Sequence, residues 1–228
     1  MIAQACATIV FTEFRHNEAG ALLLSHMQAS GYRYFALTSD IRGVLIVSRT
    51  GFEGTGNPGE LDTFPNAIIR ADFPGFVLYG VYLPTGARKF PHFDYLIRMA
   101  RQHNARNELA MAIGDFNAGR NEIDIEINAR SGNLLDEFPA HSRFVDLSAL
   151  WPEAWRHSHP AEREYSWYAS NKPVSQKKGW RLDHAFVSPA LLPSVRSARY
   201  VPESRLQGWT DHSALVVELE AMASFPSG

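Results

Sequence analysis

The sequence predicts a mixed α/β fold in which two β-sheets pack face to face and helices cover their outer faces. Strand and helix patterns alternate in the first half of the chain, whereas strand patterns follow one another in the second half. The 228 residues, of which 45% are hydrophobic and 20% charged, have the length and composition of a globular domain. Because no Pro/Gly/Ser-rich linker or internal repeat divides the chain, we expect one domain over residues 1–228.

The first half of the chain carries most of the regular patterns. Asn17 is a candidate helix cap and Gly31 a helix stop, and Pro91 suits the first turn of a second helix. That second helix has an apolar face made by Phe93, Leu96, Ile97 and Ala100. Short apolar runs predict strands at residues 7–12, 32–37, 43–48, 66–71, 76–83 and 109–113, with a glycine-rich loop at 51–59.

The second half of the chain is less regular. Residues 118–135 are polar and acidic and predict a long loop, and residues 156–164 predict a charged loop. We expect a short helix at 141–151 and a helical turn at 189–193. Strands are expected at 180–188 and 213–219.

Charge and cysteine content exclude few functions. The formal net charge of −2 argues against a strongly basic nucleic-acid coat, but a local basic cleft is enough to attract phosphates. No apolar run is long enough to cross a membrane and no leader pattern opens the chain, so we expect a cytoplasmic protein. The single cysteine, Cys6, has no base near it in sequence and is better explained as a small buried thiol than as a nucleophile.

The stretch from Gly114 to Asn117 is the first candidate for chemistry. It follows the apolar run 109–113, which has the length of a strand buried on both faces. Side chains two residues apart leave an extended chain on the same face, so Asp115 and Asn117 point together and Phe116 points into packing. An acid beside an amide at the carboxyl end of a buried strand is where open α/β sheets place their sites. The alternative is an ordinary turn, since Gly, Asp and Asn all favour turns.

Polar or acidic residues close several other predicted strands. A magnesium site needs oxygen ligands gathered from different elements, and converging acids repel one another unless a cation is present. The strand-end residues are Glu13, Tyr82, Asp115 with Asn117, Asp183 with His184, and Asp211 with His212.

Two motifs near the end of the chain, together with the earlier one, point to a family. Residues 179–188 (GWRLDHAFVS) and 209–216 (WTDHSALV) follow the Gly-Asp-Phe-Asn motif of residues 114–117 in order. This series resembles the endonuclease/exonuclease/phosphatase superfamily of metal-dependent phosphoesterases, which includes the exonuclease III-like abasic-site endonucleases. The resemblance implies a DNase I-like, four-layer α/β/β/α sandwich of two mixed β-sheets flanked by helices.

Further motifs upstream extend the resemblance from about residue 7 to residue 220. Residues 9–13 (IVFTE) look like the strand that carries the family's metal-binding glutamate, and residues 42–49 (RGVLIVSR) are similar to its next landmark strand. Residues 81–84 (VYLP) look like the strand with an active-site tyrosine, and residues 166–168 (SWY) are similar to the exonuclease III branch.

The resemblance assigns roles to the matching positions. It implies a metal site for Mg²⁺, with Mn²⁺ as an alternative, held by Glu13, Asp115, Asn117 and Asp211. Asp115 would orient or deprotonate the attacking water, and Asn117 would hold that acid, the metal or the phosphate. The chemistry is consistent, because phosphodiester hydrolysis places negative charge on oxygens that a metal ion and an imidazolium offset.

The remaining catalytic roles fall to three residues. His212, oriented by Asp183, would contact the scissile phosphate, and Tyr82 would hydrogen-bond another phosphate oxygen. A carboxylate beside a histidine favours the charged imidazolium. His184 is expected to pack or to support the site, since that position varies in the family.

The substrate stays open among three classes. DNA is the first choice: Trp167, Tyr168 and Trp180 would stack on bases or on an abasic gap, and Arg181, Lys177 and Lys178 would meet the backbone. Core aromatic residues and solvated cations explain the same pattern. The other classes are phospholipids or small phosphoesters hydrolysed on the same scaffold, and a binding module without catalysis.

One landmark of the family has no counterpart. The family opens with a strand that brings an asparagine to the active site, followed by a helix, before the glutamate strand. Only twelve residues precede Glu13, too few for those elements. Three hypotheses follow: a start assigned too late, a gap filled by another segment or chain, or weakened catalysis.

Overall fold

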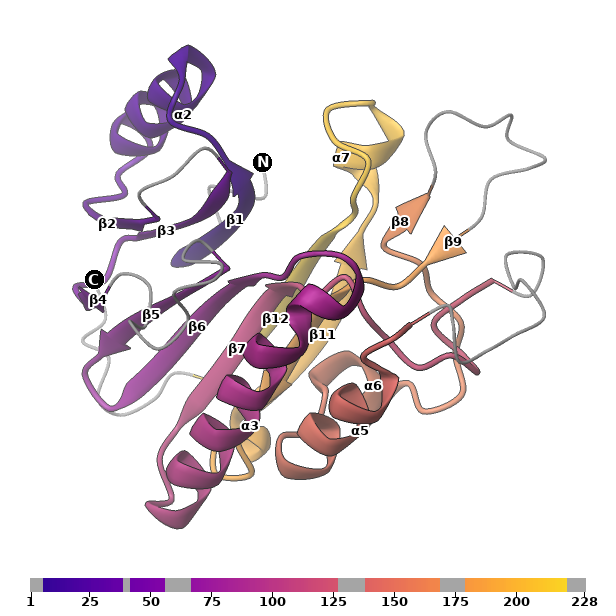
Figure 1. Ribbon diagram of the computed structural model, residues 1–228. Helices are drawn as coiled ribbons and strands as arrows, with labels where there is room; N and C mark the ends of the chain where they lie inside the picture. Colours follow the sequence, from indigo (N-terminus) through magenta and orange to yellow (C-terminus); the bar gives the residue numbers. More distant parts are fainter. Residues whose placement is uncertain (1–5, 39–41, 56–66, 127–137, 169–178, 221–228) are drawn as a thin grey trace.

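The computed structural model describes residues 6–38, 42–55, 67–126, 138–168 and 179–220 (Figure 1). The larger of its sheets has five strands in the order β10-β7-β6-β5-β4. Strands β6 and β7 are parallel, and every other neighbouring pair in this sheet is antiparallel. The strands are β4 (Glu53–Thr55), β5 (Ile68–Phe73), β6 (Phe76–Tyr82), β7 (Ala110–Asp115) and β10 (Asp183–Val187).

Three smaller sheets accompany it. An antiparallel sheet has the order β1-β3-β2, and two pairs stand apart from it, β11-β12 and β8-β9. The strands of the first are β1 (Thr8–Phe14), β2 (Tyr34–Leu37) and β3 (Gly43–Ser48). Those of the two pairs are β11 (Val195–Val201), β12 (Ala214–Leu219), β8 (Trp167–Tyr168) and β9 (Gly179–Trp180).

Helices border the sheets. The two longest are α2 (Glu18–Ala29), which begins where Asn17 Oδ1 accepts the N–H of Gly20 at 3.0 Å, and α3 (Phe90–Ala105), with Pro91 in its first turn. Both starts were predicted from the sequence, because cap residues and proline at a helix start act locally. The shorter helices are α5 (His141–Leu150), α6 (Ala154–Ser158) and α7 (Glu203–Leu206), with 3-10 turns η1 (Gly86–Lys89) and η4 (Leu192–Ser194).

The side chains of β3 show how the layers form. Val44 and Ile46 pack into the core shared with the five-stranded sheet, whereas Leu45 and Val47 pack into the core under α2. This alternation is the period of two that a strand buried on both faces imposes. A third core joins the opposite face of the five-stranded sheet to α3 and α5; in Figure 1, α3 runs in front of β7 and α5 lies beside α3. The layers are therefore helix, sheet, sheet and helix, which confirms the predicted α/β/β/α sandwich.

The two facing sheets approach closely at Gly80 in β6. A Cβ atom there would lie 2.9 Å from Val44 Cγ1, 3.1 Å from Val10 Cγ1 and 3.2 Å from Ile46 Cδ1. Such contacts are shorter than packed carbon atoms allow. The missing side chain of Gly80 thus sets the distance between the layers.

Some predicted boundaries differ from the structure. The predicted strand 180–188 is two strands, β9 and β10, because Arg181 leaves the pairing and its N–H donates to Asp124 O at 2.8 Å. Helix α6 begins before the predicted charged loop 156–164, and β11, β4 and α7 were not predicted. Parts of the predicted loops at 51–59 and 118–135 lie outside the described residues. No helix among the described residues has both the length and the hydropathy to cross a membrane.

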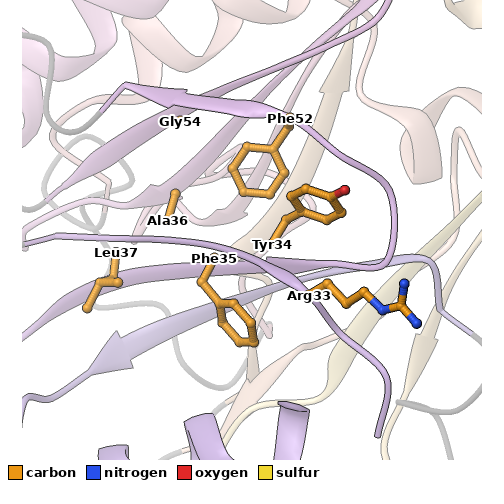
Figure 2. A pocket seen from close by; sticks show the side chains of 7 residues that line it. All are labelled: Arg33, Tyr34, Phe35, Ala36, Leu37, Phe52 and Gly54. Atoms are coloured by element: carbon orange, nitrogen blue, oxygen red, sulfur yellow. The ribbon is translucent and has the colours of Figure 1, made fainter.

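A surface pocket lies between the outer strands of two sheets (Figure 2). Its lining comes from β2 and from the segment around β4: Arg33, Tyr34, Phe35, Ala36, Leu37, Phe52 and Gly54. It contains none of the residues predicted to carry chemistry.

Candidate active site

The candidate site forms where three neighbouring strands bring polar side chains to one edge. Tyr82 ends β6 and Asp115 ends β7, and the two are partners in the parallel register. Asp183 begins the antiparallel strand β10 and pairs with Asp115 on its other side. The topology therefore brings Tyr82, Asp115 and Asp183 side by side, at the carboxyl ends of the parallel strands.

The backbone around Asp115 is bent into conformations that hold the acid. Gly114 has φ +143°, and a Cβ there would lie 2.0 Å from Val81 O, so no other residue fits. Asn117 has φ +47°, which an asparagine tolerates. Its N–H donates to Asp115 Oδ1 at 2.7 Å and its Nδ2 donates to Asp115 Oδ2 at 3.0 Å. Both oxygens of Asp115 are thereby fixed in direction.

Phe116 points away from this corner, as the strand geometry predicted. It is fully buried in the core under α3. Asp115 is buried as well, and burial together with the charge of Asp183 raises its pKa to about 8, although His212 and the Asn117 N–H act in the opposite direction.

Asp183 and His212 form a second hydrogen-bonded pair. Nδ1 of His212 lies 2.8 Å from Oδ2 of Asp183. Burial lowers the pKa of His212, but the charge and hydrogen bond of Asp183 outweigh it and raise that pKa to about 9. The ring is thus held as an imidazolium by the carboxylate of Asp183.

Glu13 reaches the site from the other sheet. Its φ of +57° lies in the left-handed region, at an irregularity in the β1–β3 register between Phe11 and Phe14. Such a bulge turns a side chain out of the regular alternation. Tyr82 donates its hydroxyl to Glu13 Oε1 at 3.0 Å, and Arg42 Nη1 lies 3.6 Å from Glu13 Oε2. The hydrogen bond from Tyr82 links the two sheets at the site.

Asp211 directly precedes His212 and is exposed. Its Oδ2 accepts the indole N–H of Trp167 at 2.8 Å, and Trp167 forms a β-bridge with His212. Trp167 and Trp180 face each other across β8 and β9 and are partly buried against the core. Their role in binding a substrate stays a prediction.

Lys89 is a site residue that the sequence reasoning missed. It is buried at the start of α3, and its Nζ donates a hydrogen bond to the carbonyl oxygen of Asn117. Burial lowers its pKa to about 8, with a smaller opposing effect from Asp115. A signal was present, because a cation at a helix N-terminus opposes the helix dipole and is unfavourable without another partner.

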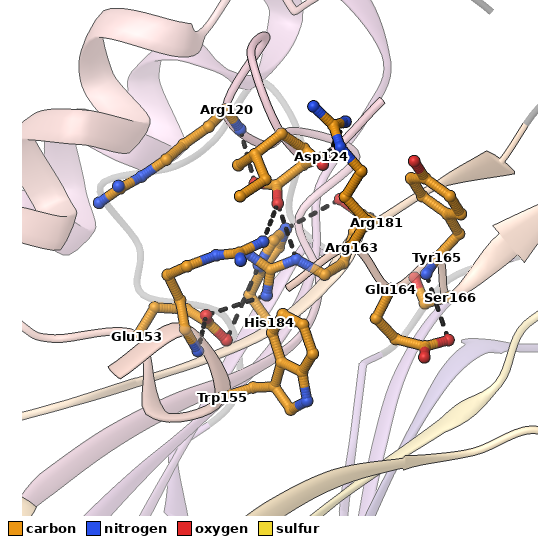
Figure 3. A network of polar contacts seen from close by, with 12 residues as sticks. Arg120, Asp124, Glu153, Trp155, Arg163, Glu164, Tyr165, Ser166, Arg181 and His184 are labelled. Carbon is orange, nitrogen blue, oxygen red and sulfur yellow. Dashed lines mark hydrogen bonds and ion pairs between the residues drawn. The ribbon is translucent and has the colours of Figure 1, made fainter. Parts of the chain in front are cut away.

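The prediction that Arg181 meets a DNA backbone is wrong. Its side chain is fully buried, with Nε 2.8 Å from Asp124 Oδ1 and Nη1 2.9 Å from Glu153 Oε2 (Figure 3). A guanidinium removed from water needs such carboxylate partners. The companion predictions for Lys177 and Lys178 lie outside the described residues.

The network around Arg181 supports the site from behind. Arg156 joins Asp124 at 2.8 Å, and the guanidinium groups of Arg156 and Arg181 lie 4.8 Å and 4.9 Å from the ring centre of Trp155. Burial alone would raise the pKa of Asp124, but the charge and hydrogen bond of Arg181, together with His184 and the backbone N–H of Arg120, lower it to about 2. The strand that begins at Asp183 is therefore anchored to an ionised, buried cluster.

Comparison with known proteins agrees with this arrangement. The model of the Endonuclease/Exonuclease/phosphatase family matches residues 8–212. The chain belongs to this family. The match covers every strand end described above, from Glu13 to His212.

Members of the family with curated functions include DNA nucleases. An exodeoxyribonuclease of Streptococcus pneumoniae is 26% identical over 187 residues, which are 74% of this chain and 64% of that protein. The DNA repair nuclease APEX1 of Danio rerio is 29% identical over 56% of this chain and 44% of its own length. The chain thus spans less than two thirds of the length of these relatives.

Solved structures of the family share the fold. The 3′-5′ exonuclease NExo from Neisseria meningitidis superposes with a TM-score of 0.75 at 23% identity, over 94% of this chain and 89% of that one. An AP endonuclease from Archaeoglobus fulgidus superposes with a TM-score of 0.74 at 21% identity, with the same coverage. The DNase I-like sandwich expected from the motifs is confirmed.

Nucleases of this family generally depend on a divalent metal, and the donor set here suits one. Glu13, Asp115, Asn117 and Asp211 offer oxygen atoms, which Mg²⁺ prefers. The adjacent carboxylates of Asp115 and Asp183 repel each other, and a bound cation would relieve that repulsion. Among the described residues, no three acidic, histidine or cysteine side chains are already gathered into a metal site.

Proposed function

We propose that this protein is a metal-dependent phosphodiesterase that hydrolyses DNA in the manner of exonuclease III-like and abasic-site nucleases. The observation that carries the proposal is the row of Tyr82, Asp115 and Asp183 on neighbouring strands, with Asn117 and His212 bonded to the two acids. Relatives named as an exodeoxyribonuclease and a DNA repair nuclease favour DNA over other phosphoesters.

Asp115 orients and deprotonates the attacking water. Asn117 donates to both carboxylate oxygens, which leaves their remaining lone pairs in defined directions for a water molecule. Lys89, bonded to the carbonyl oxygen of Asn117, keeps that residue in its left-handed conformation. These contacts preorganise the water-activating side of the site.

His212 and Tyr82 contact the phosphate. The hydrogen bond that His212 Nδ1 donates to Asp183 sets the orientation of the ring, and the ring neutralises charge that develops on a non-bridging oxygen. The Tyr82 hydroxyl donates to Glu13 in this structure and would donate to a second phosphate oxygen when the substrate binds.

Glu13 and Asp211, with oxygens of Asp115 and Asn117, would hold Mg²⁺ or Mn²⁺. A bound divalent ion supplies charge neutralisation at the phosphate and its leaving group. The carboxylate of Glu13 is half exposed, so an ion reaches it from solvent.

The test compares substrates with the purified chain in Mg²⁺ and in EDTA. The substrates are a duplex with an abasic site, a duplex with recessed 3′ ends, phosphoinositide and sphingomyelin. We expect cleavage of DNA that is lost in EDTA and in Asp115→Asn. Asp146→Asn, which changes an exposed acid on α5, is the matched control and retains cleavage.

Other outcomes contradict the proposal. Turnover of a lipid without turnover of DNA would assign the site to phospholipids. If no substrate is turned over while the metal still binds, the chain is a binding module of the family. Equal activity in EDTA would remove the metal from the mechanism.

A further inference from the structure

The turn between β11 and β12 exposes two large apolar side chains beside the candidate site. Trp209 is 79% exposed and Leu206 is 72% exposed, the highest values among the large hydrophobic residues that the structure describes. Single exposed apolar residues are common on protein surfaces, but Leu206 and Trp209 lie within four residues of each other in this turn (residues 202–213, which include α7) and form a patch. The ring faces of the indole are apolar, so the patch suits a partner that covers them.

The turn is held in place by the chain around it. The backbone N–H of Trp209 donates to Ser204 O at 3.0 Å, and the backbone N–H of Gly208 donates to Arg205 O at 3.1 Å. Arg205 lies 4.5 Å from the ring centre of Tyr168, and its Nε donates to Ser213 Oγ at 3.1 Å. Trp209 therefore stands on a preorganised support.

The same turn leads directly into the site. Trp209 precedes Asp211 by two residues and His212 by three, and Trp167 contacts both of those residues. Figure 1 shows α7 projecting from the body of the protein on the side where β8 and β9 lie. An extended substrate bound at His212 passes within reach of this projection.

We propose that Trp209 stacks on the base of the nucleotide next to the scissile phosphate. This inference rests on the proposed function, because it requires DNA as the substrate. Nucleobases offer flat faces that stack on exposed indole rings whatever the sequence. Within a duplex those faces are covered by neighbouring base pairs, so Trp209 selects DNA in which this base is unpaired or terminal. The turn is thus a specificity element for frayed ends and extrahelical nucleotides.

The test measures binding and cleavage separately. Binding is measured in EDTA by fluorescence anisotropy, with a fluorescein-labelled duplex that has a recessed 3′ end. A second duplex is identical except that the terminal nucleotide beside the scissile phosphate is replaced by tetrahydrofuran, which has no base. The variants are Trp209→Ala, Trp209→Phe and, as the matched control, Leu22→Ala on α2, where an exposed apolar side chain is removed elsewhere.

We expect Trp209→Ala to raise the Kd for the first duplex about tenfold or more, with a smaller rise for Trp209→Phe, which retains a ring. For the duplex without the base, wild type and Trp209→Ala should bind equally. Leu22→Ala should bind both duplexes like wild type.

Three results would overturn the inference. They are an unchanged Kd in Trp209→Ala, an equal loss of affinity for both duplexes, and a change only in self-association measured by sedimentation.

Cleavage in Mg²⁺ distinguishes the failure of this inference from the failure of the proposed function. If wild type binds DNA without cleaving it, the proposed function fails while the ratio of Kd values still tests Trp209. If wild type binds no DNA, both are rejected.

Discussion

Protonation of the buried His184 should make the protein less stable as the pH falls. The ring is fully buried, with Nε2 2.8 Å from Ala118 O and 3.1 Å from Arg181 O, and it packs edge-on to Phe144 at 4.7 Å. Burial and then the charge of Arg181 lower its pKa from 6.5 to about 4, against weaker opposing effects of Glu153 and other groups. The folded protein therefore keeps His184 neutral, with Nε2 as the donor.

The sign and size of the effect follow from linkage. Below pH 6.5 the unfolded chain binds a proton at this histidine, whereas the folded chain binds that proton only near pH 4. The stabilising contribution is complete above the unfolded pKa and is lost as the pH falls toward the folded pKa. A shift of this size corresponds to about 3 kcal/mol, lost at about 1.4 kcal/mol per pH unit.

The assay is urea unfolding of wild type and His184→Gln across this pH range. Glutamine keeps a donor for the two carbonyl oxygens and does not titrate, so the difference between the two proteins isolates this histidine from His212 and Asp115. We expect wild type to be more stable near neutral pH and its advantage to shrink by about 3 kcal/mol toward pH 4. A difference that stays constant with pH would refute the reasoning.

Three further tests address other parts of the structure. Asp115→Asn should lower kcat for DNA cleavage about 100-fold or more while the circular dichroism spectrum stays that of wild type; near-normal kcat would exclude it as the base. Arg181→Met should reduce the free energy of unfolding by about 3–5 kcal/mol in urea, because it leaves Asp124 buried without its main partner; a loss under about 1 kcal/mol would contradict the network's role. Gly114→Ala should cost at least about 2 kcal/mol in the same assay, whereas Gly86→Ala, with φ +68° and no atom within 4 Å, should cost about 1 kcal/mol; equal costs would show that the contact with Val81 is not limiting.

The elements that the sequence predicted are those with a local cause. Strands β3, β6 and β7 are continuous apolar runs. Helix α2 starts at its cap residue, Asn17, whose side chain bonds the backbone of Gly20 only three residues along the chain. Strand β11 was missed because its sequence, VRSARYV, mixes exposed charges with small residues, as expected of a strand with one face toward solvent.

The positions of site residues were predictable where they belong to motifs shared with the family. They were not predictable where the burial of a side chain decides its role. The order of Asp115, Asp183 and His212 along the chain was enough to place them together. The fate of Arg181 depended on Asp124 and Glu153, which are 57 and 28 residues away, and no local pattern distinguishes a buried cation from one that meets a phosphate.

Gly80 couples the packing of the core to the geometry of the candidate site. Glu13 belongs to one sheet and Asp115 to the other, and the absent side chain at Gly80 sets how far apart those sheets stand. A methyl group there would act as a wedge and lengthen the gap that Tyr82 spans to reach Glu13. Under the proposed function, a substitution at Gly80 would therefore reduce activity although every proposed catalytic side chain is still present. Screens that sort variants by residues touching the substrate would overlook them.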